Sequence, residues 1–434
     1  MMKHLHPAKI LVLGYLLYSI IGCFLLSLPI CHTAGIGLLD AYFTAISAVS
    51  TTGLTTVDIG TEYNLLGQIV ILLLVQLGGV GYMTFSSFIL LCTSQKLSTY
   101  RRRIGASSFA FPQHFSMHEF IYSVIFFSFF CELIGAAALS IVFWHRGVER
   151  WLWNGIFHSV SSFCTAGLSL FSDGFIALQD SVACNFLITG LALLGSLGFI
   201  VSLDFYKKCT ERRHQISFTT RVILVMSCLF LVLGTLLFFG LETISDGSSL
   251  FSEGMIAFFQ VVSAMTTTGF NSVDIGTLSP PILILLAFLS SFGSSPSGTG
   301  GGLKNTAFAS LTAFVKSTLK GKSTTLWHHS IPPGRVKIAT VAFIYYVFCL
   351  SVTLFFLSIT ELRAPSLDVF FEAANALNNS GLSTGLTEKL TGMGKILIAL
   401  LMLMGRVGVL TFGVAISSQK EETTVLAKKT ELIT

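Results

Sequence analysis

Long apolar runs separated by short polar stretches recur along the whole chain. A helix that crosses a bilayer needs about 20 mostly apolar residues, at a rise of about 1.5 Å per residue. Eight segments meet this requirement: residues 10–30, 65–91, 120–143, 183–205, 221–241, 281–313, 338–359 and 396–416. The pattern therefore predicts an all-α integral membrane protein with eight transmembrane helices.

Between the members of each successive pair lies a shorter, half-apolar stretch that is too short to span. These stretches are residues 41–50, 153–163, 255–265 and 368–377. We expect each to form a short helix that enters the membrane partway and returns as a pore loop.

The short stretches align with one another. A Phe stands ten residues before a glycine in every copy, and a Ser or Asn stands six residues before it. The aligned positions are Phe43, Phe157, Phe259 and Phe371; Ser47, Ser161, Ser263 and Asn375; and Gly53, Gly167, Gly269 and Gly381. Internal similarity at a fixed period of about 110 residues predicts repeats. The expected units are residues 1–99, 100–215, 216–330 and 331–434, fused around a central pore, with a Gly-rich broken second helix in the third and a short cytoplasmic tail on the fourth.

Extended backbone at membrane depth survives only where it lines a watery cavity. A small residue followed by Gly lets carbonyl oxygens point inward, where they can replace the water around K+ or Na+. The predicted filter consists of Thr51, Thr52, Gly53, Thr165, Ala166, Gly167, Thr267, Thr268, Gly269, Asn379, Ser380 and Gly381. Ordinary turns between helices are the alternative for any one copy, but four matched copies favour a filter.

Composition and charge agree with a membrane protein. The chain is 53% hydrophobic and 11% charged, with a mean hydropathy of +0.78. The net charge of +5 does not point to nucleic acid, because the Lys and Arg residues punctuate apolar runs instead of clustering on a soluble face. The nine cysteines include no CxxC pair, so no transition-metal site is expected.

The basic residues predict the orientation of the chain. In an eight-span arrangement they gather on one side, which the positive-inside rule makes cytoplasmic together with both termini. They include Lys3, Lys9, Arg101, Arg102, Arg103, Lys207, Lys208, Lys316, Lys320, Lys322, Arg335, Lys337, Lys428 and Lys429. The opposite loops are rich in Asp and Glu, which would concentrate cations at the outer mouth.

One arginine lies inside an expected span. Three second helices align as Gly-Gly-Val-Gly (78–81), Gly-Ser-Leu-Gly (195–198) and Gly-Arg-Val-Gly (405–408). A charge at this depth should face the bundle interior or the pore, where it would oppose cation passage. Arg406 is therefore a gate candidate; a structural ion pair with Glu132 is the alternative.

The second helix of the third copy is interrupted by a Gly- and Ser-rich run at residues 290–304. Pro and many Gly residues disfavour a continuous helix, and an irregular segment in a membrane belongs beside a pore. We expect a gating loop that includes Gly293, Gly298, Gly300, Gly301 and Gly302. The alternative is a plain cytoplasmic linker.

The chain resembles the pore-forming membrane subunit of the Trk/Ktr/HKT superfamily of K+ transporters over essentially its whole length, and its length is most similar to the Ktr-type subunit. The resemblance implies one filter glycine per repeat at Gly53, Gly167, Gly269 and Gly381, and a pore-facing arginine at Arg406. It also implies a homodimer in a plasma (inner) membrane, contact with membrane lipid, and a cytosolic nucleotide-binding regulatory ring. No cofactor is expected on this chain, only K+ and possibly Na+ as the transported ion. Ala166 and Ser380 depart from the Thr of the other copies, which affects the expected discrimination between K+ and Na+.

Two other functions remain open. A symporter could carry K+ or Na+ coupled to Na+ or H+ through the same cavity. A membrane enzyme would need a catalytic cluster at one membrane face, and no His, Asp and Ser constellation recurs at a common depth, so we do not expect an enzyme.

Overall fold

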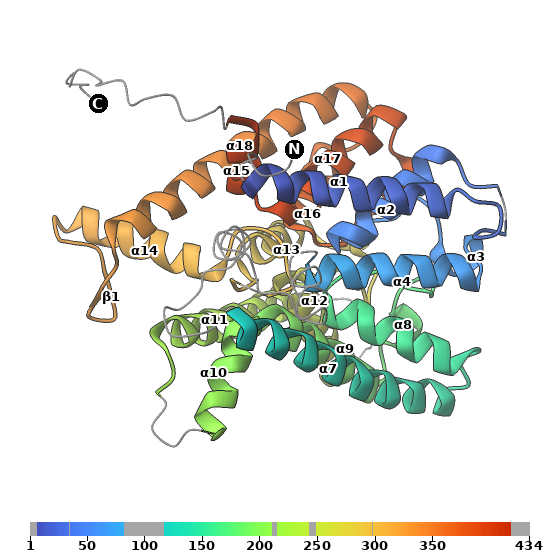
Figure 1. Cartoon of the computed structure of the whole chain (residues 1–434), viewed down its shortest axis with the longest axis horizontal. Coiled ribbons are helices and arrows are strands. Elements are labelled where there is room, and N and C mark those ends of the chain that lie inside the picture. Colours follow the sequence, from blue (N-terminus) through green and yellow to red (C-terminus); the bar gives the residue numbers. More distant parts are fainter. Residues whose placement is uncertain are drawn as a thin grey trace.

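The computed structural model describes residues 7–33, 35–81, 117–210, 215–242, 249–296 and 298–417. Its elements are almost all helices (Figure 1). Four helices are long and apolar enough to cross a membrane: α1 (Pro7–Leu26), α7 (Met117–His145), α11 (Phe218–Leu241) and α15 (Pro333–Thr360). They coincide with the four spans that we expected at the start of each unit.

A short helix follows each of these long helices. The four are α2 (Leu38–Ser50), α8 (Trp151–Phe163), α12 (Leu250–Met265) and α16 (Ser366–Asn378). Each begins a few residues before the stretch predicted from the sequence and ends within a residue of its predicted end. We call them the short helices below.

A third helix completes each unit: α4 (Leu65–Val80), α9 (Val182–Leu197), α13 (Pro280–Phe292) and α17 (Gly392–Val407). In the part of the chain that the structure describes, a further helix follows three of them, namely α10 (Phe199–Thr210), α14 (Asn305–Leu319) and α18 (Val409–Ser417). The prediction of unbroken spans over residues 183–205 and 396–416 is wrong, because α9 and α10 meet at 91° and α17 and α18 at 101°. Residues 82–91 of the predicted span 65–91 lie outside the described residues.

Glycines explain the bends. Gly198 and Gly408 have φ values of 87° and 88°, and Gly81 has a φ of 80° after α4. Only glycine adopts such dihedrals without steric cost, so the helix stops there. Each is the last residue of an aligned Gly-x-x-Gly quartet in the sequence.

Short elements cap the two ends of the bundle. Figure 1 shows α3 (Ile59–Glu62) at one end, and at the other a hairpin of β1 (Thr325–Leu326) paired with β2 (His329–Ser330). This hairpin is a small departure from the all-α prediction. Among the described residues, three 3-10 helices lie in the loops, at Ile176–Leu178, Ile275–Thr277 and Thr387–Lys389.

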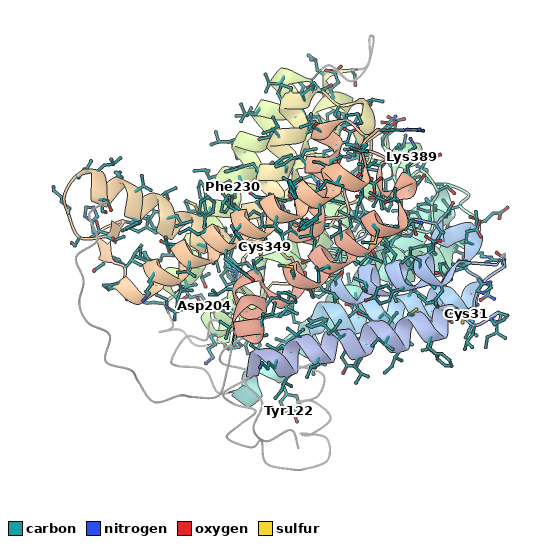
Figure 2. The ribbon with its side chains drawn as sticks, turned by 90° about the horizontal axis from the view of Figure 1, so that it is seen from above. Cys31, Tyr122, Asp204, Phe230, Cys349 and Lys389 are labelled. Atoms are coloured by element: carbon teal, nitrogen blue, oxygen red, sulfur yellow. The ribbon has the colours of Figure 1, made fainter. Side chains whose placement is uncertain are left out.

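The short helices form the centre of the molecule. Each contacts the third helix of the preceding unit, so that α4 packs on α8, α9 on α12, α13 on α16, and α17 on α2. The contacts thus close a ring in chain order. Apolar side chains on the outer faces of α7 and α11, such as Phe126, Leu133 and Leu236, are exposed, as expected for surfaces that face lipid. Side chains fill the space between the helices (Figure 2).

Candidate functional site

All four short helices end in the same turn. The residue two before the predicted glycine has a positive φ in every unit: 50° at Thr51, 51° at Thr165, 57° at Thr267 and 53° at Asn379. The next N–H group donates to the carbonyl five residues earlier: Thr52 to Ser47 at 2.9 Å, Ala166 to Ser161 at 2.8 Å, Thr268 to Ser263 at 2.9 Å and Ser380 to Asn375 at 2.8 Å. This is the Schellman motif that ends many helices. It accounts for the constant spacing between Ser or Asn and the glycine in the sequence.

After the turn, the chains of the four units meet at their glycines. A β-carbon added at Gly53 would lie 2.5 Å from the carbonyl oxygen of Ala166, and one added at Gly381 would lie 2.8 Å from the Cα of Gly53. A β-carbon at Gly167 would collide with Thr268, and one at Gly269 would collide with Gly381. The four glycines therefore form a closed ring in chain order, which we call the glycine ring.

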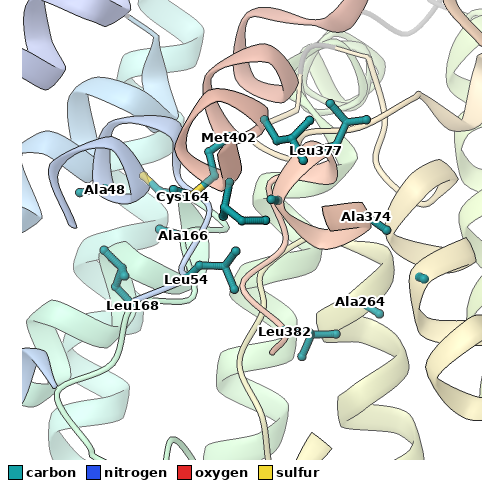
Figure 3. Close-up of a cluster of buried hydrophobic side chains, with 14 of the residues drawn as sticks. Ala48, Leu54, Cys164, Ala166, Leu168, Ala264, Ala374, Leu377, Leu382 and Met402 are labelled. Carbon is teal, nitrogen blue, oxygen red and sulfur yellow. The ribbon is translucent and has the colours of Figure 1, made fainter. Parts of the chain in front are cut away.

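Carbonyl oxygens face this ring. Those of Thr52, Ala166 and Thr268 each lie against a glycine of an adjacent unit. The residue after each glycine packs into the core: Leu54, Leu168, Phe270 and Leu382 are each 1% exposed. Figure 3 shows the three leucines among other buried apolar side chains. Several buried polar atoms of residues that precede the ring glycines in the chain have no hydrogen-bond partner within the described chain, among them Thr51 Oγ1, Asn379 Oδ1 and Ser380 Oγ. Buried polar atoms are rarely left alone, so these residues have unused capacity to bind water or a cation.

Glycines also let the third helix of each unit approach the end of its own short helix. A β-carbon at Gly78, Gly195, Gly293 or Gly405 would collide with the carbonyl oxygen of Val49, Phe163, Met265 or Leu377, respectively. Each of these carbonyls lies four residues before a ring glycine. Gly293, predicted as part of a gating loop, therefore has a packing role at the end of α13.

The Gly-rich segment between α13 and α14 lies against the ends of the short helices. The Thr299 hydroxyl is 3.1 Å from that of Thr165 and donates to the carbonyl of Phe163 at 3.2 Å. The Gly301 N–H donates to Thr267 Oγ1 at 3.0 Å. The other predicted glycines are equally crowded: Gly298 lies against Ser196, Gly300 against Ser294 and Thr267, and Gly302, with a φ of 66°, against Ser290 and Asn378. Ser297 lies outside the described residues.

Arg406 joins this segment to a different unit. Its guanidinium donates to the carbonyl of Thr299 in the Gly-rich segment and to the carbonyls of Gly78 and Gly79 at the end of α4, the last at 3.3 Å. Glu132 accepts hydrogen bonds from Gln76 at 3.1 Å and from Cys164 at 3.6 Å. Within the described chain the partners of Arg406 are thus backbone carbonyls, and the alternative of an ion pair with Glu132 is not what the structure shows.

Sequence reasoning missed Lys304. Its ammonium group donates to the carbonyls of Gly300 and Gly301 at 2.7 Å and 2.9 Å. Together with Arg406 it binds three successive carbonyls of the Gly-rich segment. The signal was available, because Lys304 is a charge inside the predicted span 281–313, the same criterion that singled out Arg406.

Sequence reasoning also missed a polar cluster that holds the fourth unit against the third. The amide of Asn378 donates to the hydroxyls of Ser290 and Ser291 at 2.9 Å and 3.0 Å, and the Tyr346 hydroxyl donates to Asn378 Oδ1 at 2.9 Å. Asn379, a predicted filter residue, donates to Thr52 Oγ1 at 2.9 Å. Nothing in the sequence pairs these residues, because their partners lie far away along the chain.

Comparison with known proteins shows that this chain is similar to cation transport proteins. The family described as TrkH, cation transport protein, matches residues 16–425. Ktr system potassium uptake protein B of Bacillus subtilis is 33% identical over 416 residues, which cover 94% of this chain and 92% of that protein. Potassium/sodium uptake protein NtpJ of Enterococcus hirae is 32% identical, over 97% of this chain and 95% of that protein.

The fold of this chain is also similar to a solved structure. The crystal structure of the potassium transporter TrkH from Vibrio parahaemolyticus superimposes with a TM-score of 0.74 at 22% identity, over 94% of this chain and 84% of that chain. The family match covers most of the chain, and the curated relatives match over nearly their full length. The chain therefore belongs to the TrkH family of cation transport proteins, as a pore subunit of the Trk/Ktr type.

Proposed function

We propose that this chain takes up K+ across a membrane through one central pore, and that the glycine ring with its neighbouring residues is the selectivity filter. The observation that carries the proposal is the closed ring of four glycine backbones with carbonyl oxygens beside it. Such oxygens can replace the hydration shell of a monovalent cation. The C-terminal ends of four short helices, each with partial negative charge, converge on the same place. The potassium uptake named for the relatives of this chain agrees with K+ as the ion.

The gate in this proposal is the Gly-rich segment together with Arg406. The segment lies against the filter turns of the second and third units, through Thr165 and Thr267. A fixed guanidinium beside it opposes cation passage by charge. Opening requires that the segment leave these contacts, so that Gly298, Gly300, Gly301 and Gly302 move as one piece.

The four units of the sequence, residues 1–99, 100–215, 216–330 and 331–434, are part of the same proposal. The identical turns and the ring of helix contacts support it. We further propose an eight-span topology in an inner membrane with both termini cytoplasmic, a homodimer, contact with membrane lipid, and a cytosolic nucleotide-binding regulator. The termini themselves lie outside the described residues.

A second candidate function is K+ or Na+ uptake coupled to Na+. The similarity to a potassium/sodium uptake protein favours it. Ala166 in the filter of the second unit, where two other units have Thr, removes a hydroxyl that could take part in ion selection. Reversal potentials under separate K+ and Na+ gradients distinguish the two functions, since obligatory coupling makes both gradients contribute.

The first experiment is K+ uptake in cells that lack their own K+ importers. The chain should restore growth on low K+ and accumulate K+ down its electrochemical gradient. A chain that is present in the membrane and carries no monovalent cation, even with a Ktr-type regulator, would contradict the proposal.

A further inference from the structure

A polar side chain on each short helix holds the chain beyond the glycine ring. In the second unit, His158 accepts from the N–H of Leu170 at 3.3 Å, and in the third the Gln260 amide donates to Ser272 at 3.2 Å. In the first unit, Asp40 accepts from the hydroxyl of Thr56 at 2.7 Å. These partners, and those of Glu372 in the fourth unit, begin two or three residues after a ring glycine. We call these contacts the outer tethers.

The tether of the fourth unit is the most extensive. Glu372 follows Phe371 in α16 and is 1% exposed. One carboxylate oxygen accepts from the Ser383 hydroxyl at 2.5 Å and from the Thr384 N–H at 3.0 Å. The other accepts from the Thr387 hydroxyl at 2.6 Å. The Thr384 hydroxyl also donates to the first oxygen, at 3.5 Å. Four donors from the segment after Gly381 therefore converge on one side chain.

These donors are all neutral. Within the described residues, Glu372 has no Lys or Arg partner, although it is buried in the middle of the molecule. A buried carboxylate is costly unless hydrogen bonds satisfy it, and hydrogen bonds to an ionised acceptor are stronger than those between neutral groups. Ionic pairing therefore does not account for Glu372, whereas anchoring of residues 383–387 does.

The hydrogen bond from the Thr384 N–H to Glu372 also limits the direction of the Ser383 carbonyl. The peptide unit between Ser383 and Thr384 is trans, so its N–H and C=O point in opposite directions. Because the Thr384 N–H points to the Glu372 carboxylate, the carbonyl of Ser383 points away from that carboxylate.

We propose that Glu372 is a positioning residue for ion selection: it turns the Ser383 carbonyl toward the pore and holds it there, as an outer layer of cation ligands above Gly381. The proposal rests on the proposed function as a cation pore. Glu372 acts through Ser383 and Thr384 and does not itself touch the ion. The carbonyl of Thr384 lies near Gly276 of the third unit: a β-carbon added at Gly276 would be 2.8 Å from its oxygen. The anchored segment therefore contacts α16 on one side and the third unit on another.

The test compares Glu372→Gln with Glu372→Ala in the full-length chain, in cells that lack their own K+ importers. Gln keeps one acceptor oxygen for Ser383 and Thr384 and removes the charge, whereas Ala removes every contact. The readout is the ratio of K+ to Na+ uptake at matched amounts of protein in the membrane. We expect a fall of about tenfold for Ala, in line with the loss of hydrogen bonds to a charged acceptor, and a ratio close to wild type for Gln.

Glu361 provides a matched control in the same unit. It is 8% exposed and accepts from the N–H and hydroxyl of Thr391 at 3.1 Å and 2.6 Å, at the start of α17 and not beside the filter. Glu361→Ala should leave the uptake ratio unchanged. If Glu372→Ala does not reach the membrane, Ser383→Ala and Thr387→Val each remove one tether and should lower the ratio by a smaller factor.

The outcomes separate the inference from the proposed function. No cation uptake by the wild type overturns the pore itself. Uptake by the wild type with an unchanged ratio in the Glu372→Ala, Ser383→Ala and Thr387→Val variants overturns only the tether. A Gln variant as impaired as the Ala variant means that the acceptor oxygen retained by Gln does not suffice to hold the segment. An equal effect of Glu361→Ala means that the uptake ratio reports general stability. Either result contradicts positioning as proposed.

Discussion

At the scale of single residues, the glycine ring leaves no space for side chains. Gly269 has a φ of 88°, and a β-carbon there would collide with the backbone of Gly381 in the neighbouring unit. The conformation and the close approach both require glycine, and each alone disfavours any other residue.

Replacement of this glycine should damage selection more than folding. We expect Gly269→Ser to lower the ratio of K+ to Na+ uptake by roughly tenfold or more, because strain of about 1–3 kcal/mol displaces carbonyls that must match a bare cation. Gly240→Ala is the control, since Gly240 is a glycine of α11 with nothing within 4 Å of an added β-carbon. Equal ratios in the two variants would argue against the ring as the filter.

Arg406 is the second residue with a predictable effect. Its guanidinium binds carbonyls of both the Gly-rich segment and α4. Arg406→Ala removes the fixed charge and these contacts, so we expect faster K+ uptake than in the wild type at equal expression. Arg406→Lys keeps the charge but cannot bridge the same carbonyls, and its rate should lie between the two. Slower uptake in Arg406→Ala would contradict a gating role, provided that the protein is present in the membrane.

At the scale of elements, the Gly-rich segment lies against the ends of the short helices and against the bend between α9 and α10. At Gly198 an added β-carbon would lie 2.7 Å from the carbonyl oxygen of Pro296 and 2.8 Å from the N of Gly298. Gly408 has nearly the same φ but meets only Thr411, at 3.7 Å. The two positions therefore share nearly the same φ and differ in contact with the Gly-rich segment.

This difference makes a paired experiment possible. Gly408→Ala should lower the free energy of unfolding by about 1–3 kcal/mol, the cost of placing a side chain in a positive-φ conformation that glycine alone adopts readily, and should leave uptake nearly unchanged. Gly198→Ala should show the same loss and, in addition, an altered uptake rate, because it displaces the Gly-rich segment. Thermal unfolding in detergent and uptake in cells measure the two effects; identical behaviour of the variants would mean that the segment does not control flux.

At the scale of the whole molecule, the two ends of the bundle differ in charge. The end with the β1–β2 hairpin carries Lys316, Lys320 and Lys322, whereas the end with α3 carries Asp58 and Glu62 (Figure 1). Lys389 and Asp204 are exceptions to this pattern, since Figure 2 shows Lys389 toward the same end as Cys31 and Asp204 away from it. The distribution fits a cytoplasmic hairpin and an external α3.

Labelling can check this orientation. In a background without the native cysteines, we expect Lys389→Cys to react with a membrane-impermeant maleimide in intact cells. Lys320→Cys should react only after the membrane is opened. Both side chains are exposed, so access is limited by the membrane alone. The reverse pattern would invert the topology, and labelling of both in intact cells would contradict the membrane placement of the bundle.

The sequence by itself determined the short helices, the ring glycines and the family of the chain. These follow from local features: runs of apolar residues long enough to span, a Ser or Asn six residues before each glycine, and a glycine where a turn needs one. The Schellman turn involves only neighbours along the chain, so its trace is visible in the spacing of Ser47 and Gly53.

Only the tertiary structure decided the bends at Gly198 and Gly408, the carbonyl partners of Arg406 and Lys304, and the tethers of Glu372. A glycine permits a bend but does not require one, and apolar periodicity continues through both breaks. Arg406 reaches residues more than 100 positions away in the chain, and Glu372 binds a segment whose course depends on the packing of a neighbouring unit. Hydrogen bonds between distant segments leave no spacing in a single sequence, and the fold is what brings such partners together.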